Sequence, residues 1–158
     1  MIPPVYSIED LRYVPRHFGT VADRIWNAWW RPCNEPLSSV QAALSEVMAA
    51  TEYPSFTLVA VAEKAFLGTV TVIEQDITAR PELGPCIAAL WVEEPARGRG
   101  VAGALVAAAC QRLATTGFQV VYLAARPHLR GYYSSRSWTL VESDVGEDAL
   151  DVFARALP

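Results

Sequence analysis

A glycine-rich turn between an apolar strand and an apolar helix constrains this chain more than any other segment. Residues 90–103 read LWVEEPARGRGVAG, and the segment Val101–Thr116 is the longest one with helical character, ended by Gly117. The start of a helix carries unpaired backbone N–H groups and a partial positive charge. Glycines let a phosphate approach that backbone without meeting a Cβ atom. The segment therefore predicts a phosphate-binding turn that opens a helix.

The distribution of charge agrees with an anion site in this part of the chain. No Asp or Glu occurs from Pro95 to Val141, whereas that stretch holds six of the 13 Lys and Arg residues, including Arg97 and Arg99. These two arginines add long-range attraction for an anion. The rest of the sequence carries all 17 acids, and the net charge of −4 argues against general nucleic-acid binding.

The composition indicates a single domain over residues 1–158. This length is enough for one hydrophobic core, and 52% of the residues are apolar. No apolar run reaches the roughly 20 residues needed to span a bilayer, and residues 1–4 lack the basic and apolar regions of a signal peptide. We therefore expect a cytoplasmic protein without a membrane partner. The three cysteines form no CxxC pair, so neither a disulfide framework nor a metal site is predicted, and Cys86 and Cys110 are expected in the core.

Hydrophobic periodicity predicts a mixed α/β fold with the element order β-α-α-β-β-β-α-β-α-β-β. The expected strands are residues 5–11, 56–62, 66–75, 87–93, 119–125, 138–142 and 150–154, and the expected helices are residues 15–30, 38–48, 101–116 and 129–135. Ser38 and Gln41 fit a capping box at the start of the second helix. Trp26 and Trp29 share the core face of the first helix, and Trp30 is offset toward a pocket or an interface. The helix at 101–116 is expected to join two parallel strands.

Three classes of phosphate ligand can be compared with this turn. A Walker loop requires GK[ST] at its end, and none is present. Gly98, Gly100 and Gly103 match the dinucleotide pattern GxGxxG literally. However, the first glycine lies five positions after the last residue of the strand, and no acid follows until Glu142, so the context does not fit a ribose-binding Rossmann site. A dinucleotide-binding module therefore remains only as a disfavoured alternative.

The segment Arg97-x-x-Gly100-x-Ala102 fits the signature [QR]-x-x-G-x-[GA] of the GCN5-related N-acetyltransferases (GNAT). The chain resembles that family, and its bacterial small-molecule members in particular, over nearly its whole length. The resemblance implies acetyl-coenzyme A as co-substrate and no metal. It implies a cofactor site formed by Leu90, Trp91, Val92, Arg97, Gly98, Arg99, Gly100, Val101, Ala102 and Gly103. Backbone N–H groups of the turn would hold the pyrophosphate, and the strand would pair with the pantetheine arm. A bulge near Leu90 would separate this strand from the one at 119–125 and leave an N–H for the thioester carbonyl.

The resemblance also implies an acid for the leaving thiolate. The segment 132–138, YYSSRSW, resembles the family pattern [FY]-Y-x-x-x-G-[FW] and places Tyr133 at the acid position, with Tyr132 as a fallback that more often packs in the core. Ser137 replaces the usual glycine, so the end of this helix is expected to differ.

The base that deprotonates the amine is less well defined by the sequence. Glu93 is the first candidate, and Glu74 and Asp76, near the end of the neighbouring strand, are alternatives. Each of these acids also fits a solvated strand end. A water molecule that relays the proton would remove the need for any of them. His128 follows the strand at 119–125 and fits a surface histidine better than a base.

The resemblance therefore implies transfer of an acetyl group to the amine of a small molecule. The acidic balance outside residues 95–141 suits a cationic acceptor. A non-catalytic acyl-CoA-binding or sensor module is the main alternative, since Ser137 departs from the family pattern and the base is not evident. The excess of apolar residues is consistent with a homodimer.

Overall fold

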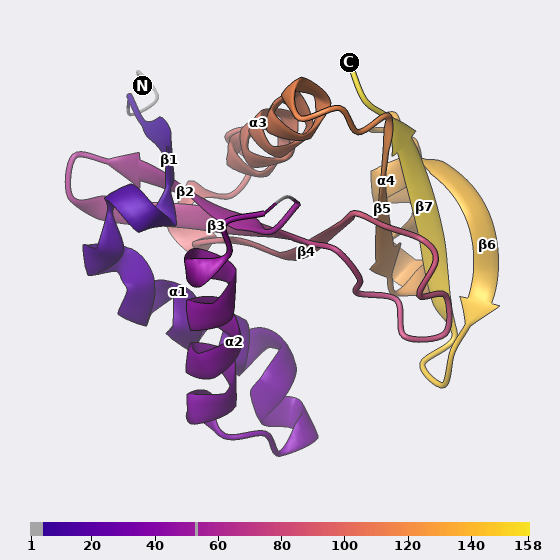
Figure 1. The fold of residues 1–158 in the computed structure, drawn as a ribbon, viewed down its shortest axis with the longest axis horizontal. Coiled ribbons are helices and arrows are strands. Elements are labelled where there is room, and N and C mark those ends of the chain that lie inside the picture. The colour runs from indigo at the N-terminus through magenta and orange to yellow at the C-terminus, as the bar shows by residue number, and fades with distance from the viewer. Residues whose placement is uncertain (1–4, 53) are drawn as a thin grey trace.

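A seven-stranded mixed sheet organises the computed structural model, which describes residues 5–52 and 54–158 (Figure 1). The strand order is β1-β2-β3-β4-β5-β7-β6, in which β4 and β5 are parallel and the other neighbours are antiparallel. The strands are β1 (Ser7–Asp10), β2 (Phe56–Ala62), β3 (Ala65–Ile73), β4 (Cys86–Val92), β5 (Val120–Ala125), β6 (Thr139–Val145) and β7 (Leu150–Ala156). The helices are α1 (Phe18–Ile25), α2 (Leu37–Ala49), α3 (Val101–Thr115) and α4 (Arg130–Ser134). The predicted mixed α/β class and element order are confirmed.

Two helical layers cover opposite faces of the sheet. Successive residues of β2 point to opposite faces, so Leu58 lies in the cluster that contains α3, and Val59 lies in the cluster that contains α1 and α2. Because both faces are covered, β2 is apolar along almost its whole length. Figure 1 shows α1 and α2 together on one side of β2 and β3, and α3 on the other side.

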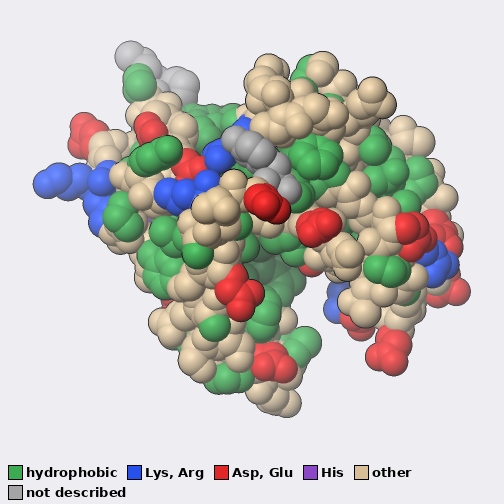
Figure 2. All heavy atoms as spheres, viewed as in Figure 1, with side chains coloured by type: hydrophobic (Ala, Val, Ile, Leu, Met, Phe, Trp, Pro, Cys, Tyr) green, Lys and Arg blue, Asp and Glu red, His purple; other side chains and the backbone are tan. Residues whose placement is uncertain are grey.

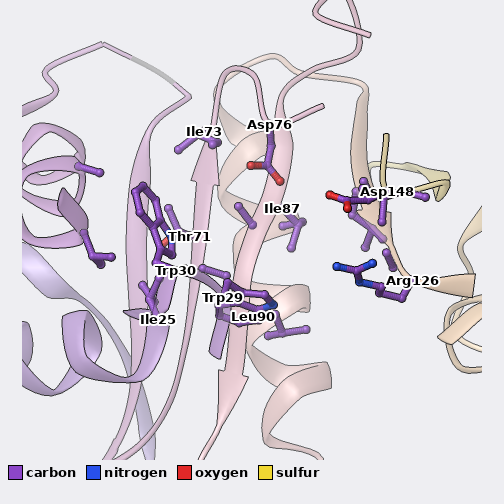
Figure 3. A pocket seen from close by; sticks show the side chains of 18 of the residues that line it. Ile25, Trp29, Trp30, Thr71, Ile73, Asp76, Ile87, Leu90, Arg126 and Asp148 are labelled. Atoms are coloured by element: carbon purple, nitrogen blue, oxygen red, sulfur yellow. The ribbon is translucent and has the colours of Figure 1, made fainter. Parts of the chain in front are cut away.

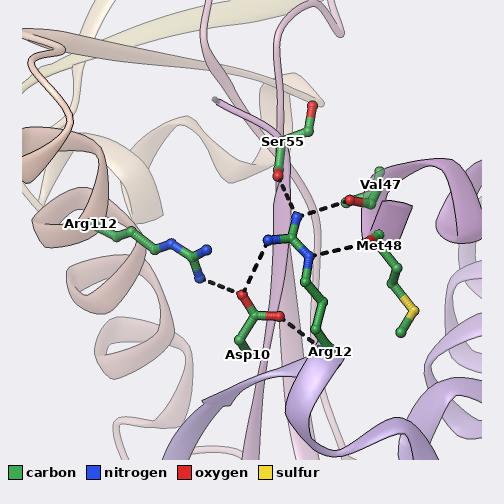
Figure 4. Close-up of polar contacts among 6 residues, drawn as sticks. All are labelled: Asp10, Arg12, Val47, Met48, Ser55 and Arg112. Carbon is green, nitrogen blue, oxygen red and sulfur yellow. Dashed lines mark hydrogen bonds and ion pairs between the residues drawn. The ribbon is translucent and has the colours of Figure 1, made fainter. Parts of the chain in front are cut away.

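An ion cluster joins the two layers at the start of the sheet (Figure 4). Asp10 is almost fully buried, and its carboxylate accepts hydrogen bonds from the Arg12 backbone N–H at 2.8 Å and from Arg112 Nη1 of α3 at 2.6 Å. The Arg12 guanidinium donates to the carbonyls of Val47 and Met48 at 3.1 and 3.0 Å. The Val47 carbonyl also accepts the Ala50 N–H at 3.3 Å, so Arg12 adds a charged donor to carbonyls in the last turn of α2, where the helix has its negative end.

The first helical segment departs from the prediction of one continuous α-helix. A 3₁₀ turn precedes α1, and α1 ends at Ile25. Residues Trp26–Trp30 then form a π-helical turn, followed by a 3₁₀ turn that ends at Asn34 with φ = 61°. The prediction of one continuous α-helix is therefore wrong, and the different number of residues per turn changes the directions in which the tryptophans point.

The capping box predicted at Ser38 and Gln41 is also wrong. The helix α2 begins one residue earlier, at Leu37, and its N-cap residue is Pro36, without a side-chain cap. Proline holds φ near the helical value, and the Pro36 carbonyl accepts the Ser39 N–H at 3.1 Å. This backbone contact satisfies an N–H group near the one that the Ser38 hydroxyl was expected to bind.

The core prediction for the cysteines is confirmed. Cys86 and Cys110 are buried, and burial raises the pKa of the Cys86 thiol to about 11. No helix within residues 5–52 and 54–158 is long and apolar enough to cross a bilayer. The expectations for the N-terminal residues 1–4 lie outside the described residues.

Candidate active site

The turn between β4 and α3 has the geometry expected of an anion site. Gly98 and Gly100 adopt left-handed φ values of 74° and 82°, which disfavour any residue with a Cβ atom. A Cβ built at either position, or at Gly103, would meet no atom within 4 Å, so this side of the turn is open. The 15-residue helix α3 makes its first intrahelical bond from Ala104 N to Gly100 O at 3.0 Å. The N–H groups before Ala104 precede that bond and have no acceptor within the helix.

Arg97 folds back onto the strand instead of extending from the turn. Its Nε donates to the Val92 carbonyl at 2.8 Å, and its guanidinium carbon lies 4.7 Å from the centre of the Trp91 ring. Arg97 thus braces the end of β4 and keeps its charge close to the turn. Arg99 is exposed, and its side chain remains free to approach an anion from solvent.

A bulge in β4 opens the sheet beside this turn. The β3–β4 register runs from Thr69↔Trp91 to Thr71↔Ala88, so β4 carries one more residue than β3 across this interval. Ala89 takes a left-handed φ of 50° inside the bulge, a strained conformation for a residue with a Cβ atom. The sequence-based prediction of a bulge near Leu90 is confirmed.

The strands β4 and β5 separate beyond their first contact. Their register holds one residue pair, Cys86↔Tyr122, and Tyr122 N also donates to Pro85 O at 3.0 Å. Within the described part of the chain, Ala89 and Leu90 have no register partner on either neighbouring strand. Backbone groups of β4 therefore face a gap in the sheet.

A cavity of about 530 Å³ lies at this gap, on the side of the sheet that carries α1 and α2 (Figure 3). Figure 2 shows the corresponding hollow between the two halves of the molecule, with hydrophobic side chains inside it and acidic side chains near its rim. Its lining comes from every layer around the gap: Trp29 and Trp30 after α1, Leu44 of α2, Thr71 of β3, Leu90 of β4, Leu123 of β5 and Tyr133 of α4. Of the predicted cofactor residues, Leu90 lines the cavity, and the turn at 97–103 lies outside it.

Tyr133 is held at the edge of the cavity by aromatic neighbours. Its ring centre lies 5.5 Å from that of Phe153, 6.3 Å from that of Trp138 and 5.0 Å from that of Tyr132. Burial raises the pKa of Tyr133, and the adjacent Tyr132 adds to the effect. The hydroxyl therefore keeps its proton at neutral pH and can donate it.

The helix that carries Tyr133 ends as a glycine-capped helix would, although a serine stands at the cap. Ser137 has a left-handed φ of 68°. The Tyr133 carbonyl accepts the N–H groups of Arg136 at 2.9 Å and Trp138 at 3.3 Å. The longer of these bonds is the one that defines a Schellman motif. The expected difference at this helix end is absent, because serine adopts the conformation of glycine at some conformational cost.

The candidate bases lie in three different surroundings. Glu93 pairs with Arg24, whose Nε lies 2.5 Å from Glu93 Oε1, and Glu93 is not among the cavity-lining residues. Glu74 lines a separate, smaller pocket. Asp76 lines the main cavity from the loop after β3 (Figure 3). Asp76 is an exposed residue, yet desolvation by the protein around its carboxyl raises its pKa above the ordinary value. His128 is exposed, as expected of a surface histidine.

The tryptophans show what sequence reasoning missed. Trp29 was predicted to face the core, but it is 44% exposed and lines the cavity beside Trp30. Trp26 packs against the core and donates its indole N–H to Glu35 O at 2.7 Å. The π-helical turn explains the difference, because its wider winding rotates Trp29 away from the position that an α-helix would give it.

Comparisons with known proteins agree with this geometry. The sequence model described as the acetyltransferase (GNAT) family matches residues 22–136. Among curated proteins, no relative matches the chain. An aminoglycoside 6′-N-acetyltransferase complexed with coenzyme A aligns with a TM-score of 0.74 at 19% identity, covering 98% of both chains. An acetyltransferase of the GNAT family from Staphylococcus aureus aligns at 0.68 with 12% identity, covering 98% of this chain and 100% of the other. An acyl-CoA N-acyltransferase from Pseudomonas aeruginosa aligns at 0.67 with 18% identity, covering 97% of this chain and 99% of the other. At these identities the likeness concerns the fold.

Proposed function

This chain belongs to the acetyltransferase (GNAT) family, and on that premise we propose that it transfers the acetyl group of acetyl-coenzyme A to the amine of a small molecule. The observation that carries the proposal is the position of the unpartnered β4 backbone at Ala89 and Leu90. It lies at a cavity that also contains the Tyr133 side chain, on a strand that leads directly to the open glycine turn.

The donor is proposed to bind along the strand, the turn and the start of α3. The backbone N–H groups of residues 98–103 would hold the pyrophosphate, because the glycine turn is open and the helix contributes its positive end. The pantetheine arm would pair with the backbone of Leu90, Trp91 and Val92 as an additional strand in the gap beside β5. A backbone N–H in the bulge would polarise the thioester carbonyl.

The transfer itself requires two proton movements. The amine nitrogen attacks the thioester carbon, the new C–N bond forms, and the C–S bond breaks. Tyr133 gives its hydroxyl proton to the departing sulfur and later regains a proton from solvent, and its raised pKa keeps the hydroxyl protonated until then. The proton lost by the amine passes to Asp76 or to water. Glu93 remains a second candidate for this step, but its contact with Arg24 and its place outside the cavity favour Asp76.

The proposal is tested by thiol release from acetyl-coenzyme A in the presence of a panel of amines. We expect Tyr133→Phe to lower kcat by about 10²–10⁴-fold, which is the usual contribution of a positioned general acid. Tyr132→Phe is the matched control, because Tyr132 is partly exposed and does not line the cavity. Unchanged turnover in Tyr133→Phe would remove this residue from the mechanism.

The contact between Arg24 and Glu93 favours one alternative function. A carboxylate that is committed to an ion pair is poorly available as a base, and if Asp76 does not take the proton either, the chain would suit a non-catalytic module that binds acyl-CoA. Calorimetry that detects tight binding of coenzyme A, together with no transfer to any amine, would support this alternative over the enzyme.

A further inference from the structure

The walls of the cavity constrain the acceptor. Trp29 and Trp30 form one side, and aliphatic side chains from α1, α2 and β4 continue it. Trp29 is partly exposed, but its ring is held edge-on against Trp91, with centres 6.5 Å apart and planes 86° apart. An exposed indole that is fixed in this way offers a flat apolar surface to a ligand at low conformational cost.

Apart from its charged side chains, the cavity has few polar groups that a ligand could use. The Thr71 hydroxyl already shares a 2.9 Å hydrogen bond with the Thr57 hydroxyl. Tyr133 is assigned to the thiolate in the proposed reaction. An acceptor with many hydroxyl groups would lose its bonds to water here without replacing them. The wall therefore disfavours sugars and favours an apolar carbon body.

The charges that face the cavity set the charge of the acceptor. Asp76 and Asp148 contribute two carboxylates to the lining, and Arg126 contributes one guanidinium. Figure 3 shows Asp148 and Arg126 on the same side of the cavity, while Asp76 points in from the loop after β3. Arg126 offsets one carboxylate, so the lining has an excess of one negative charge, which matches one ammonium group. A second ammonium on the same ligand would have to leave water beside apolar side chains without a carboxylate of its own, which disfavours a polyamine.

We propose that the acceptor is a primary monoamine carried on a flat apolar body, with its ammonium directed at Asp76 and its body against Trp29 and Trp30. This inference rests on the proposed function, since it names the substrate class of the same site. It separates this chain from an aminoglycoside acetyltransferase, whose fold it shares.

The acceptor class is tested with four amines and acetyl-coenzyme A: phenethylamine, tryptamine, spermidine and kanamycin. We expect kcat/KM for the two aromatic monoamines to exceed that for spermidine and kanamycin by at least about ten-fold. Equal or faster acetylation of spermidine or kanamycin would overturn the acceptor class and leave the proposed function intact. No acetylation of the two aromatic monoamines would likewise overturn the acceptor class, whereas the proposed activity is overturned only if thiol release is also absent with the wider amine panel.

A pair of variants tests the aromatic wall directly. Trp29→Ala is expected to raise KM for tryptamine about ten-fold and to change KM for acetyl-coenzyme A much less, and a thermal melt of the variant checks that it still folds. Tyr13→Ala is the matched control, because Tyr13 is an exposed aromatic residue, 81% accessible, outside the cavity. An unchanged KM for tryptamine in Trp29→Ala would show that the acceptor does not use this wall.

Discussion

The strand β4, which lines the candidate active site, leaves no room for a side chain at Gly68 of β3. A Cβ atom at this position would lie 2.8 Å from the Trp91 carbonyl oxygen, 3.2 Å from Leu105 Cδ1 and 3.3 Å from Val92 Cγ2. The closest of these is a backbone atom, so the contact cannot be relieved by a rotamer change. Gly68→Ala must push β4 away from β3 next to the bulge.

The expected loss of stability follows from two opposing effects. Overpacking in a well-packed interior costs about 1–3 kcal/mol, and replacing glycine returns about 0.4–1 kcal/mol by restricting the unfolded chain. The midpoints of the two ranges leave a net loss of about 1.3 kcal/mol. For a chain of this size that corresponds to a fall in Tm of about 3–5 °C. Because the displaced backbone is the one proposed to bind pantetheine, the affinity for coenzyme A should fall as well.

Scanning calorimetry of Gly68→Ala, with and without coenzyme A, measures both effects. Gly19→Ala is the matched control, since Gly19 lies in the first turn of α1 and its added Cβ would meet no atom within 4 Å. That variant should be neutral or more stable by up to about 1 kcal/mol. A Gly68→Ala protein with an unchanged or higher Tm would refute the close approach of β3 and β4 described above.

Three further predictions concern single positions. Ser137→Gly should raise the free energy of unfolding by about 0.5–1 kcal/mol in urea denaturation, because it removes a left-handed φ of 68° from a residue with a Cβ atom, and a lower midpoint would contradict this. Gly100→Ala should weaken coenzyme A binding about ten-fold in calorimetry, because φ = 82° costs alanine about 1–2 kcal/mol and the turn relaxes away from the open geometry; equal affinity would argue against this site. Arg130 lowers the pKa of buried Asp151 below 3.8, so this pair stabilises the fold above that pH and the contribution is lost as pH falls through the lowered value. Asp151→Asn should therefore show a shallower loss of stability on acidification than the wild type, and an equally steep loss would exclude the pair as its cause.

The strands and α3 were predictable because their periodicity is local. The bounds of β2 agree with the predicted 56–62, and α3 ends one residue before the predicted Thr116. The bulge near Leu90 followed from family resemblance, and its strained Ala89 gives no local signal of its own. The glycine turn was also readable, since its special conformations fall on glycine residues.

The cavity was less predictable because it depends on contacts between distant segments. Asp76 and Tyr133 line the same space from loops and helices far apart in the sequence. Glu93 was the first candidate base, but Arg24, 69 residues away, engages it. Trp29 was misplaced because an α-helical winding was assumed where a π-helical turn occurs. A run of three tryptophans within five residues was the available signal that this helix does more than pack.

Because β4 and β5 share a single register pair, the sheet consists of two leaves, β1-β2-β3-β4 and β5-β7-β6, with few backbone bonds between them. A donor that binds as proposed, along the β4 backbone in the gap, would supply hydrogen bonds that the polypeptide lacks, and the sheet would then be continuous only in the complex with coenzyme A. Coenzyme A at one hundred times its Kd would then raise the free energy of unfolding by about 2.7 kcal/mol. We expect the β5–β7–β6 leaf to gain hydrogen-exchange protection when coenzyme A is added, because the ligand joins the leaf to the rest of the sheet.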